Sequence, residues 1–163
     1  MKIDVLVLDG VFDTGLATVL DAFGTANELA EMFGLTSLRF DVSTVGVRKT
    51  VRTSQGLGVP VVPVAGLTAP DLAIVPALGY KMPRALLAAL ARPDVSDARD
   101  TLRRWADEGA MTAAACIGTF VLAESALLDG QDATTTWWLA PLFRQRYPKV
   151  RLDESRIIDE GLD

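Results

Sequence analysis

One stretch of the sequence decides how the rest is interpreted: Met111-Thr-Ala-Ala-Ala-Cys-Ile-Gly-Thr-Phe-Val-Leu-Ala-Glu-Ser-Ala-Leu-Leu-Asp-Gly130. Its first residues form a short apolar run typical of a buried strand, and the residues from Gly118 onward are typical of a helix. Cys116, the only cysteine of the chain, lies where the strand turns into the helix. The segment therefore has the pattern of a nucleophile elbow with cysteine in place of serine. The chain contains no histidine, however, so no imidazole is available to activate the thiol.

Strands and helices are expected to alternate on both sides of this turn. The pattern predicts strands at 3–8, 38–45, 71–77, 112–115, 150–152 and 156–159, and helices at 13–31, 83–92, 96–108, 118–128 and 135–146. The segment 51–63 is rich in valine, glycine and proline, which predicts an edge strand or a hairpin. Asp13 or Thr14 is expected to cap the first helix, and Gly34 to end it. The alternation predicts an α/β fold, a three-layer α/β/α sandwich with a mainly parallel sheet.

Composition excludes several classes of protein. The 163 residues, half of them apolar, suffice for one domain with a sizeable core. The formal net charge of −5 argues against nucleic-acid binding by this chain itself. No apolar run approaches the roughly 18 residues that a membrane span needs, and Met1–Leu8 is too short for a signal peptide. We therefore expect a cytoplasmic protein without a membrane partner. The single cysteine and the lack of histidine predict no internal disulfide, no metal site and no cofactor.

The surroundings of Cys116 suggest a site for a reactive or ligand-binding thiol. Small residues at 113–115 let the backbone turn sharply. The amides of Ile117 to Thr119 are then expected to direct free N–H groups toward the sulfur, where they can hold an oxyanion or a thiolate. The position also fits the rule that open α/β sheets bind ligands beyond the carboxyl ends of their strands. The alternative is a small buried hydrophobic residue, which is how most free cysteines behave.

A longer motif carries a resemblance to a known family: Ala115-Cys-Ile-Gly-Thr-Phe-Val-Leu-Ala-Glu-Ser-Ala-Leu-Leu-Asp-Gly-Gln-Asp-Ala-Thr-Thr-Thr-Trp137. It resembles the signature of the ThiJ/PfpI superfamily, whose fold is flavodoxin-like, of the class I glutamine amidotransferase type. Within that superfamily the chain is most similar to the amidase-like N-terminal domain of AraC-type, GlxA-like transcriptional regulators. Three further segments fit the same pattern, Val5–Val11, Asp21–Phe23 and Asp71–Ala77. The resemblance covers nearly the whole chain.

The departures from the family pattern bear on function. The histidine of the family falls on Thr136, and the acidic residue that catalytic relatives present near the start of the first helix falls on Gly15. Of the family's Cys-His-Glu set only Cys116 remains. Threonine can form hydrogen bonds but cannot carry protons near neutral pH. The resemblance therefore implies a domain that has kept the pocket and lost hydrolytic chemistry.

The resemblance also implies a domain organisation. Regulators of this family carry a C-terminal pair of helix-turn-helix motifs that contact DNA, and no such segment is present between Met1 and Asp163. The last expected strand is not followed by a closing helix. We expect residues 1–163 to be a single ThiJ/PfpI-like domain, truncated at its C-terminus, that contacts DNA only through a domain absent from this chain.

The function implied is that of a ligand-sensing and dimerising domain without catalysis. A small-molecule effector would lie over Cys116 against the amides of Ile117 and Gly118, and its binding would bias the geometry of a homodimer. Further ligand contacts are expected from residues at the same sheet edge or in motif positions: Asp9, Gly10, Gly79, Thr136 and Trp137.

One of these residues has a specific expected role, and others have an alternative that involves no ligand. In relatives, the turn equivalent to 78–82 supplies an oxyanion-binding amide, which is the role expected of Gly79, while Tyr80 would close over the site. For Asp9 and Gly10 the alternative is a turn without any ligand. For the pair at 137 and 138, the alternative is one tryptophan in the core and one at an edge or interface.

A different class of function remains open. The chain could be a cysteine-dependent enzyme, isocyanide hydratase-like or glyoxalase-like, in which Asp9, Asp13 or Asp21 assists Cys116. A carboxylate within hydrogen-bond reach of the sulfur would favour that alternative, and its absence would favour sensing. A third option is a redox sensor in which the thiol is oxidised to a sulfinic acid held by local amides.

Overall fold

The chain folds into three layers around one parallel sheet. The structure is a computed structural model that describes residues 1–35 and 37–155. Its main sheet has the strand order β5-β2-β1-β6-β7, and every neighbouring pair is parallel. These strands span Lys2–Leu6 (β1), Asp41–Gly46 (β2), Val62–Pro63 (β5), Leu72–Val75 (β6) and Met111–Ala114 (β7). The predicted α/β class and parallel sheet are confirmed.

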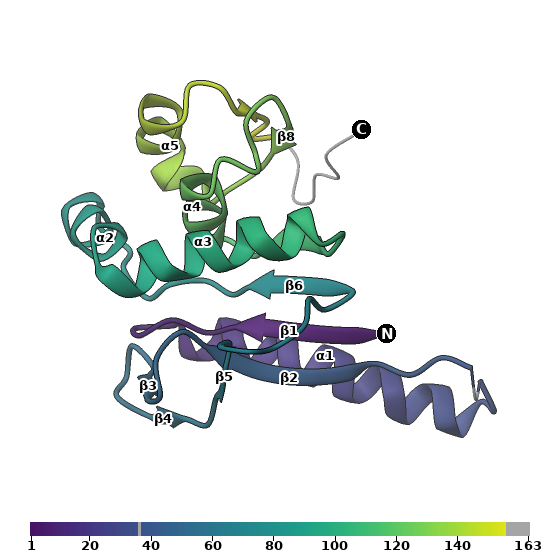
Figure 1. The fold of residues 1–163 in the computed structure, drawn as a ribbon. Coiled ribbons are helices and arrows are strands. Elements are labelled where there is room, and N and C mark those ends of the chain that lie inside the picture. The colour runs from purple at the N-terminus through teal and green to yellow at the C-terminus, as the bar shows by residue number, and fades with distance from the viewer. Residues whose placement is uncertain (36, 156–163) are drawn as a thin grey trace.

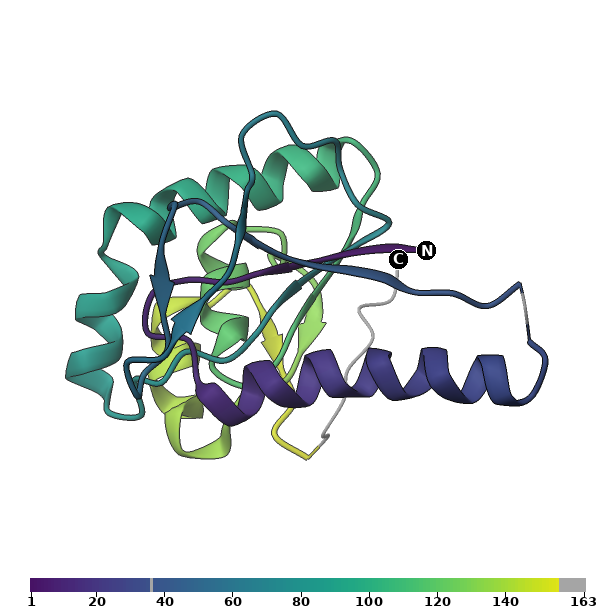
Figure 2. The same cartoon turned by 90° about the horizontal axis from the view of Figure 1, so that it is seen from below.

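Helices cover the two faces of the sheet unequally. Helix α1 (Asp13–Met32) lies on one side of the strands and α3 (Pro93–Asp107) on the other, as Figure 2 shows. The α3 side also carries α2 (Pro83–Leu90) and α4 (Gly118–Glu124). Figure 1 shows α4 and α5 (Ala140–Arg146) on the side of α3 that faces away from α1. The chain thus builds its thicker layer from its second half.

Alternation along β1 produces two separate cores. Ile3 and Val5 pack on the α1 side, whereas Leu6 packs on the side of α3 and α4, and all three are fully buried. Trp105 of α3 is also fully buried in that second core. A strand in which both faces are covered is mostly apolar, which is why this segment reads as an apolar run interrupted only at Asp4. Burial of each such side chain contributes about 1.5–3 kcal/mol.

Two short strand pairs lie outside the main sheet. The predicted hairpin within 51–63 is present as β3 (Val51–Arg52) paired antiparallel with β4 (Gly58–Val59), and the same segment ends in the edge strand β5. The second pair joins β8 (Asp132–Ala133) to β9 (Arg151–Leu152). Strand β8 was not predicted, because two residues are too few to show a periodic pattern. The strand predicted at 156–159 lies outside the described residues.

Several predicted element boundaries are wrong, and each has a local cause. Helix α1 begins without a side-chain cap, because the Asp13 carboxylate accepts hydrogen bonds from the β3–β4 hairpin instead. The residue at the capping position is Phe12, so Thr14 is not the cap either. Helix α3 begins at Pro93, three residues earlier than expected, since proline is favoured in the first turn of a helix. The predicted end of α1 is confirmed, with Gly34 at a φ of 70°.

The second half of the chain contains shorter helices than the sequence predicts. Helix α4 ends at Glu124, because the Ser125 hydroxyl hydrogen-bonds to the Leu122 carbonyl and Ala126 turns to a φ of 62°. The helix predicted over 135–146 begins instead as a 3₁₀ turn, η1 (Trp137–Leu139), and continues as α5. No described helix is both long and apolar enough to cross a membrane.

One carboxylate is buried inside this fold. Asp4 of β1 is 1% exposed, and its Oδ2 atom has no hydrogen-bond partner among the described residues. The Lys2 ammonium lies 3.6 Å from that oxygen. Burial raises the pKa of Asp4, and the attraction of Lys2 offsets this only in part.

We expect Asp4→Asn to change how stability depends on pH. Because the pKa of Asp4 is raised in the folded chain, the residue destabilises the fold above that pKa, and the penalty disappears as the pH falls through it. The variant should therefore have the higher free energy of unfolding at neutral pH and lose this advantage on acidification. Urea unfolding followed by tryptophan fluorescence at several pH values measures both. A difference between the two proteins that does not vary with pH would contradict the prediction.

Candidate functional site

Cys116 occupies a strained and accessible turn beyond β7. The strand ends at Ala114, Cys116 has a φ of 54°, and α4 begins at Gly118. A non-glycine residue in this left-handed region costs on the order of 1–3 kcal/mol, so the surrounding structure must impose it. The cysteine is exposed. The predicted elbow is present, and the alternative of a small buried hydrophobic residue is wrong.

Close packing beneath the turn explains the Cys-x-Gly spacing. A Cβ atom on Gly118 would lie 2.4 Å from the Val75 carbonyl oxygen and 2.7 Å from that of Pro76. No side chain fits such a gap, so only glycine lets the start of α4 approach the end of β6 this closely. The residues of α4 from 118 to 123 are all buried. The elbow is therefore held in place by the burial of the helix that follows it.

The amides at this turn are only partly free. The Gly118 N–H donates to the Ala115 carbonyl at 2.8 Å, and the Thr119 N–H donates to the Cys116 carbonyl at 3.3 Å. The expectation that all amides from Ile117 to Thr119 are free to face the sulfur is therefore wrong for two of the three. The Ile117 N–H makes no hydrogen bond with any residue that the structure describes.

A loop rich in threonine lies against the elbow. The Thr135 hydroxyl donates to the Cys116 carbonyl at 3.1 Å, which fixes the loop beside the turn. Thr136, which we expect at the position of the family histidine, is 7% exposed, and its hydroxyl has no hydrogen-bond partner among the described residues. An unpaired buried hydroxyl costs about 1–3 kcal/mol. Thr136 therefore lies in the loop next to the elbow, but the hydrogen bond to Cys116 is made by Thr135.

The two tryptophans follow this loop in η1. Trp137 is 74% exposed, and Trp138 is also exposed, so the alternative that places one of them in the core is wrong. Their rings meet edge to face at 5.7 Å. The Trp138 Nε1 atom donates to the Lys81 carbonyl at 3.2 Å, which joins η1 to the loop after β6. A contact between Trp137 and a ligand remains a prediction.

The loops after β1 and β6 are joined through two glycines. The Gly79 N–H donates to the Gly10 carbonyl at 2.8 Å. A Cβ on Gly10, which has a φ of 77°, would lie 2.5 Å from the Tyr80 hydroxyl oxygen, and one on Gly79 would lie 2.3 Å from Cβ of Ser54. The Gly79 amide is therefore not free to bind an oxyanion, and the role predicted for it is wrong. Gly79 instead allows the loops after β1, β3 and β6 to pack against one another.

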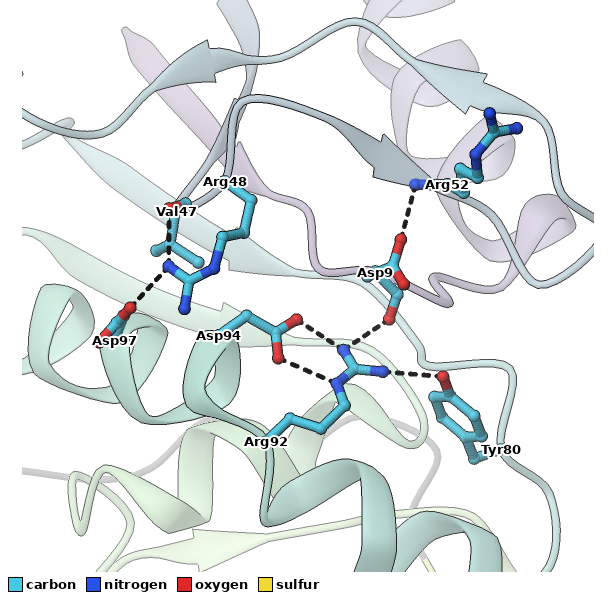
Figure 3. A network of polar contacts seen from close by, with 8 residues as sticks. All are labelled: Asp9, Val47, Arg48, Arg52, Tyr80, Arg92, Asp94 and Asp97. Carbon is cyan, nitrogen blue, oxygen red and sulfur yellow. Dashed lines mark hydrogen bonds and ion pairs between the residues drawn. The ribbon is translucent and has the colours of Figure 1, made fainter.

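Arg92 joins these loops to α3, a role that no local sequence pattern predicts. Its guanidinium donates to both carboxylate oxygens of Asp94 at 2.9 and 2.6 Å, to the Asp9 carbonyl at 2.8 Å and to the Tyr80 hydroxyl at 2.8 Å (Figure 3). Burial opposes the charge, but the hydrogen bonds and charge of Asp94 outweigh it, and the pKa of Arg92 is raised. Tyr80 is thereby held toward Arg92, and its predicted closure over Cys116 is not observed.

No carboxylate assists the thiol among the residues described. The Asp9 Oδ1 atom accepts from the Arg52 N–H at 2.9 Å. Asp13 accepts from the Ser54 hydroxyl at 2.8 Å and from the Gln55 N–H at 3.2 Å. Hydrogen bonds from Thr53 and Ser54 lower the pKa of Asp13. Asp9 and Asp13, two of the three carboxylates considered as partners of the thiol, are therefore hydrogen-bonded to the loops after β1 and β2. Asp21, the third, is exposed on α1.

Comparison with known proteins agrees with this geometry. No family model matches the chain. A segment of 68 residues, 42% of the chain, is 34% identical to the HTH-type transcriptional regulator GlxA of Rhizobium meliloti and spans only 21% of that protein's length. The predicted resemblance to GlxA-like regulators is thus confirmed over part of the chain.

Solved structures show the same fold over nearly the whole chain. An AraC family transcriptional regulator from Pseudomonas putida matches with a TM-score of 0.75 at 18% identity, over 98% of this chain and 79% of its own. DJ-1beta of Drosophila melanogaster matches with a TM-score of 0.69 at 18% identity, over 98% and 77%. A two-domain protein from Anabaena variabilis with DJ-1/ThiJ/PfpI-like and ferritin-like domains matches at 0.65 and 21%, over 97% and 41%. The DJ-1/ThiJ/PfpI fold is therefore confirmed.

We expect Gly118→Ala to destabilise the chain by more than about 2 kcal/mol, because its new methyl group would meet backbone carbonyls that cannot move aside. Gly24→Ala is the matched control, since nothing lies within 4 Å of a Cβ at that position in α1. The control should stabilise the chain by about 0.5–1 kcal/mol through helix propensity. Urea unfolding measures both, and equal effects of the two substitutions would show that the contact beneath the elbow is not tight.

Proposed function

We propose that this chain is the ligand-sensing and dimerising domain of an AraC-type transcriptional regulator, and that it has no catalytic activity. The observation that carries the proposal is an exposed, strained Cys116 elbow in a chain without histidine. The segment shared with GlxA and the fold shared with an AraC family regulator support the assignment.

The chemistry at the elbow supports binding over catalysis. A nucleophilic cysteine needs a base that is itself held in place. Thr136 stands where the family has histidine, and a threonine hydroxyl cannot serve as a general base near neutral pH. Asp9 and Asp13 are engaged by backbone and hydroxyl groups of the loops. A ligand can still hydrogen-bond to the thiol and to the Ile117 amide, so binding does not need the missing base.

Charge supports a division of labour between this chain and a DNA-binding domain. A net charge of −5 disfavours contact with phosphates, so DNA would be bound by a separate helix-turn-helix domain of a cytoplasmic protein. A small polar effector at the Cys116 edge would favour one arrangement of two subunits over another. Because a ligand shifts an equilibrium only by its differential affinity for the two states, the effector must contact a loop that differs between them.

The proposal predicts that the purified chain does not turn over isocyanides or glyoxals in a Cys116-dependent manner. The matched variant is Cys116→Ser, which keeps a small polar side chain at the turn. Product formation followed by chromatography should be indistinguishable between the two proteins. Turnover that is present in the wild type and lost in the variant would replace this proposal with the hydratase-like or glyoxalase-like alternative.

Dimerisation is tested separately by sedimentation velocity on the same chain. We expect a concentration-dependent shift from monomer to dimer. In the complete regulator, an effector that protects Cys116 from alkylation should change DNA affinity at least severalfold. A chain that stays monomeric throughout, or an effector that leaves DNA affinity unchanged, would remove the sensing role.

A further inference from the structure

A cavity lies away from Cys116, beyond the carboxyl ends of β1 and β2. Its volume is about 480 Å³, and it is lined by Asp9, Arg48, Thr50, Arg52, Arg92, Pro93 and Asp94. Strand β6 separates β1 from β7 in the sheet, so this cavity and the elbow occupy different parts of the same edge. The carboxyl edge of a parallel sheet, near the strand where the order reverses, is the general location of ligand sites in open α/β folds.

One wall of this cavity is fixed and electrically neutral. The Arg92 and Asp94 side chains are only 24% and 9% exposed, and they form a bidentate ion pair. Arg92 also donates to the Asp9 carbonyl and to the Tyr80 hydroxyl, so four of its five N–H groups already have partners. This pair shapes the cavity and positions its other residues, and it leaves little capacity for a ligand charge.

Two opposite charges remain available to a ligand. Both hydrogen bonds that Arg48 makes with described residues come from Nη1, to the Val47 carbonyl at 3.0 Å and to Asp97 at 2.6 Å (Figure 3). The edge formed by Nε and Nη2 is therefore open. Asp9 accepts from the Arg52 N–H through Oδ1 only, and its Oδ2 has no partner among the described residues.

Arg52 contributes its backbone to the cavity more than its charge. Its guanidinium donates to the Gly56 carbonyl within the β3–β4 hairpin. Figure 3 shows this side chain pointing away from Asp9 and Arg92. The charges that face a ligand are thus one guanidinium edge and one carboxylate oxygen.

We propose that this cavity binds a small zwitterion, a molecule that carries one carboxylate and one ammonium group. The carboxylate pairs with the Nε–Nη2 edge of Arg48, a bidentate geometry that guanidinium favours, with the Thr50 hydroxyl beside it. The ammonium donates to Oδ2 of Asp9. A simple anion would leave the Oδ2 atom of Asp9 without a partner, and a simple cation would leave the Nε–Nη2 edge of Arg48 unused, so each makes only one of the two charged contacts.

A series of ω-amino acids from glycine to 6-aminohexanoate tests this assignment, because it varies the distance between the two charges. Each member is compared with the carboxylate and the amine of the same length, by isothermal titration calorimetry on the whole chain. We expect one chain length to bind with a Kd below about 10 mM, and each singly charged counterpart to bind at least tenfold more weakly. No binding across the series, or equal binding of a singly charged counterpart, would overturn the proposal.

Variants separate this cavity from the elbow. Arg48→Gln and Asp9→Asn should each weaken the best zwitterion at least tenfold, and Asn at position 9 can still accept from the Arg52 N–H. Arg84→Gln and Asp107→Asn are controls at exposed positions outside the cavity. Cys116→Ser should leave the affinity unchanged. Binding that is lost in Cys116→Ser but kept in Arg48→Gln would place the ligand at the elbow and overturn the assignment of this cavity, without affecting the proposed sensing role.

Discussion

The contact between the start of α4 and the last carbonyls of β6 is the constraint on which the site depends. Gly118 approaches the Val75 and Pro76 oxygens so closely that a single methyl group cannot be added. This approach forces the turn before it into a left-handed conformation at Cys116. Burial of α4 stabilises the arrangement, since six consecutive residues of that helix lose their solvent contact. Exposure of the thiol is therefore a consequence of packing beneath it.

Close backbone contacts at glycines also organise the rest of the carboxyl edge of the sheet. Gly10 and Gly79 bring the loops after β1 and β6 into direct contact, and the Gly79 N–H is used in that contact. Arg92 then joins both loops to the start of α3 through an ion pair with little exposure to water. Loops held by backbone contact and by a partly buried guanidinium present their remaining groups in a fixed geometry, which is what small-ligand recognition requires.

The sequence predicts those parts of this arrangement that depend on neighbouring residues. Apolar runs locate the strands, and the Cys-x-Gly spacing locates the elbow, because both are local patterns. Predictions fail where the partner is distant in sequence. Asp13 leaves its expected capping role for Ser54, 41 residues away, and Arg92 bonds to the Asp9 carbonyl 83 residues away. The Gly79 amide donates to the carbonyl of Gly10, which is also distant in sequence, so its predicted role could be corrected only from the structure.

The placement of the three tryptophans has a practical consequence. Trp105 is fully buried in the larger core, whereas Trp137 and Trp138 are exposed and their rings contact each other. Trp138 also hydrogen-bonds to the loop after β6. Indole emission depends on polarity and on nearby quenchers, so the chain contains two kinds of intrinsic optical probe. One kind monitors the integrity of the interior, and the other monitors the surface where η1 meets the loop after β6, without any attached dye.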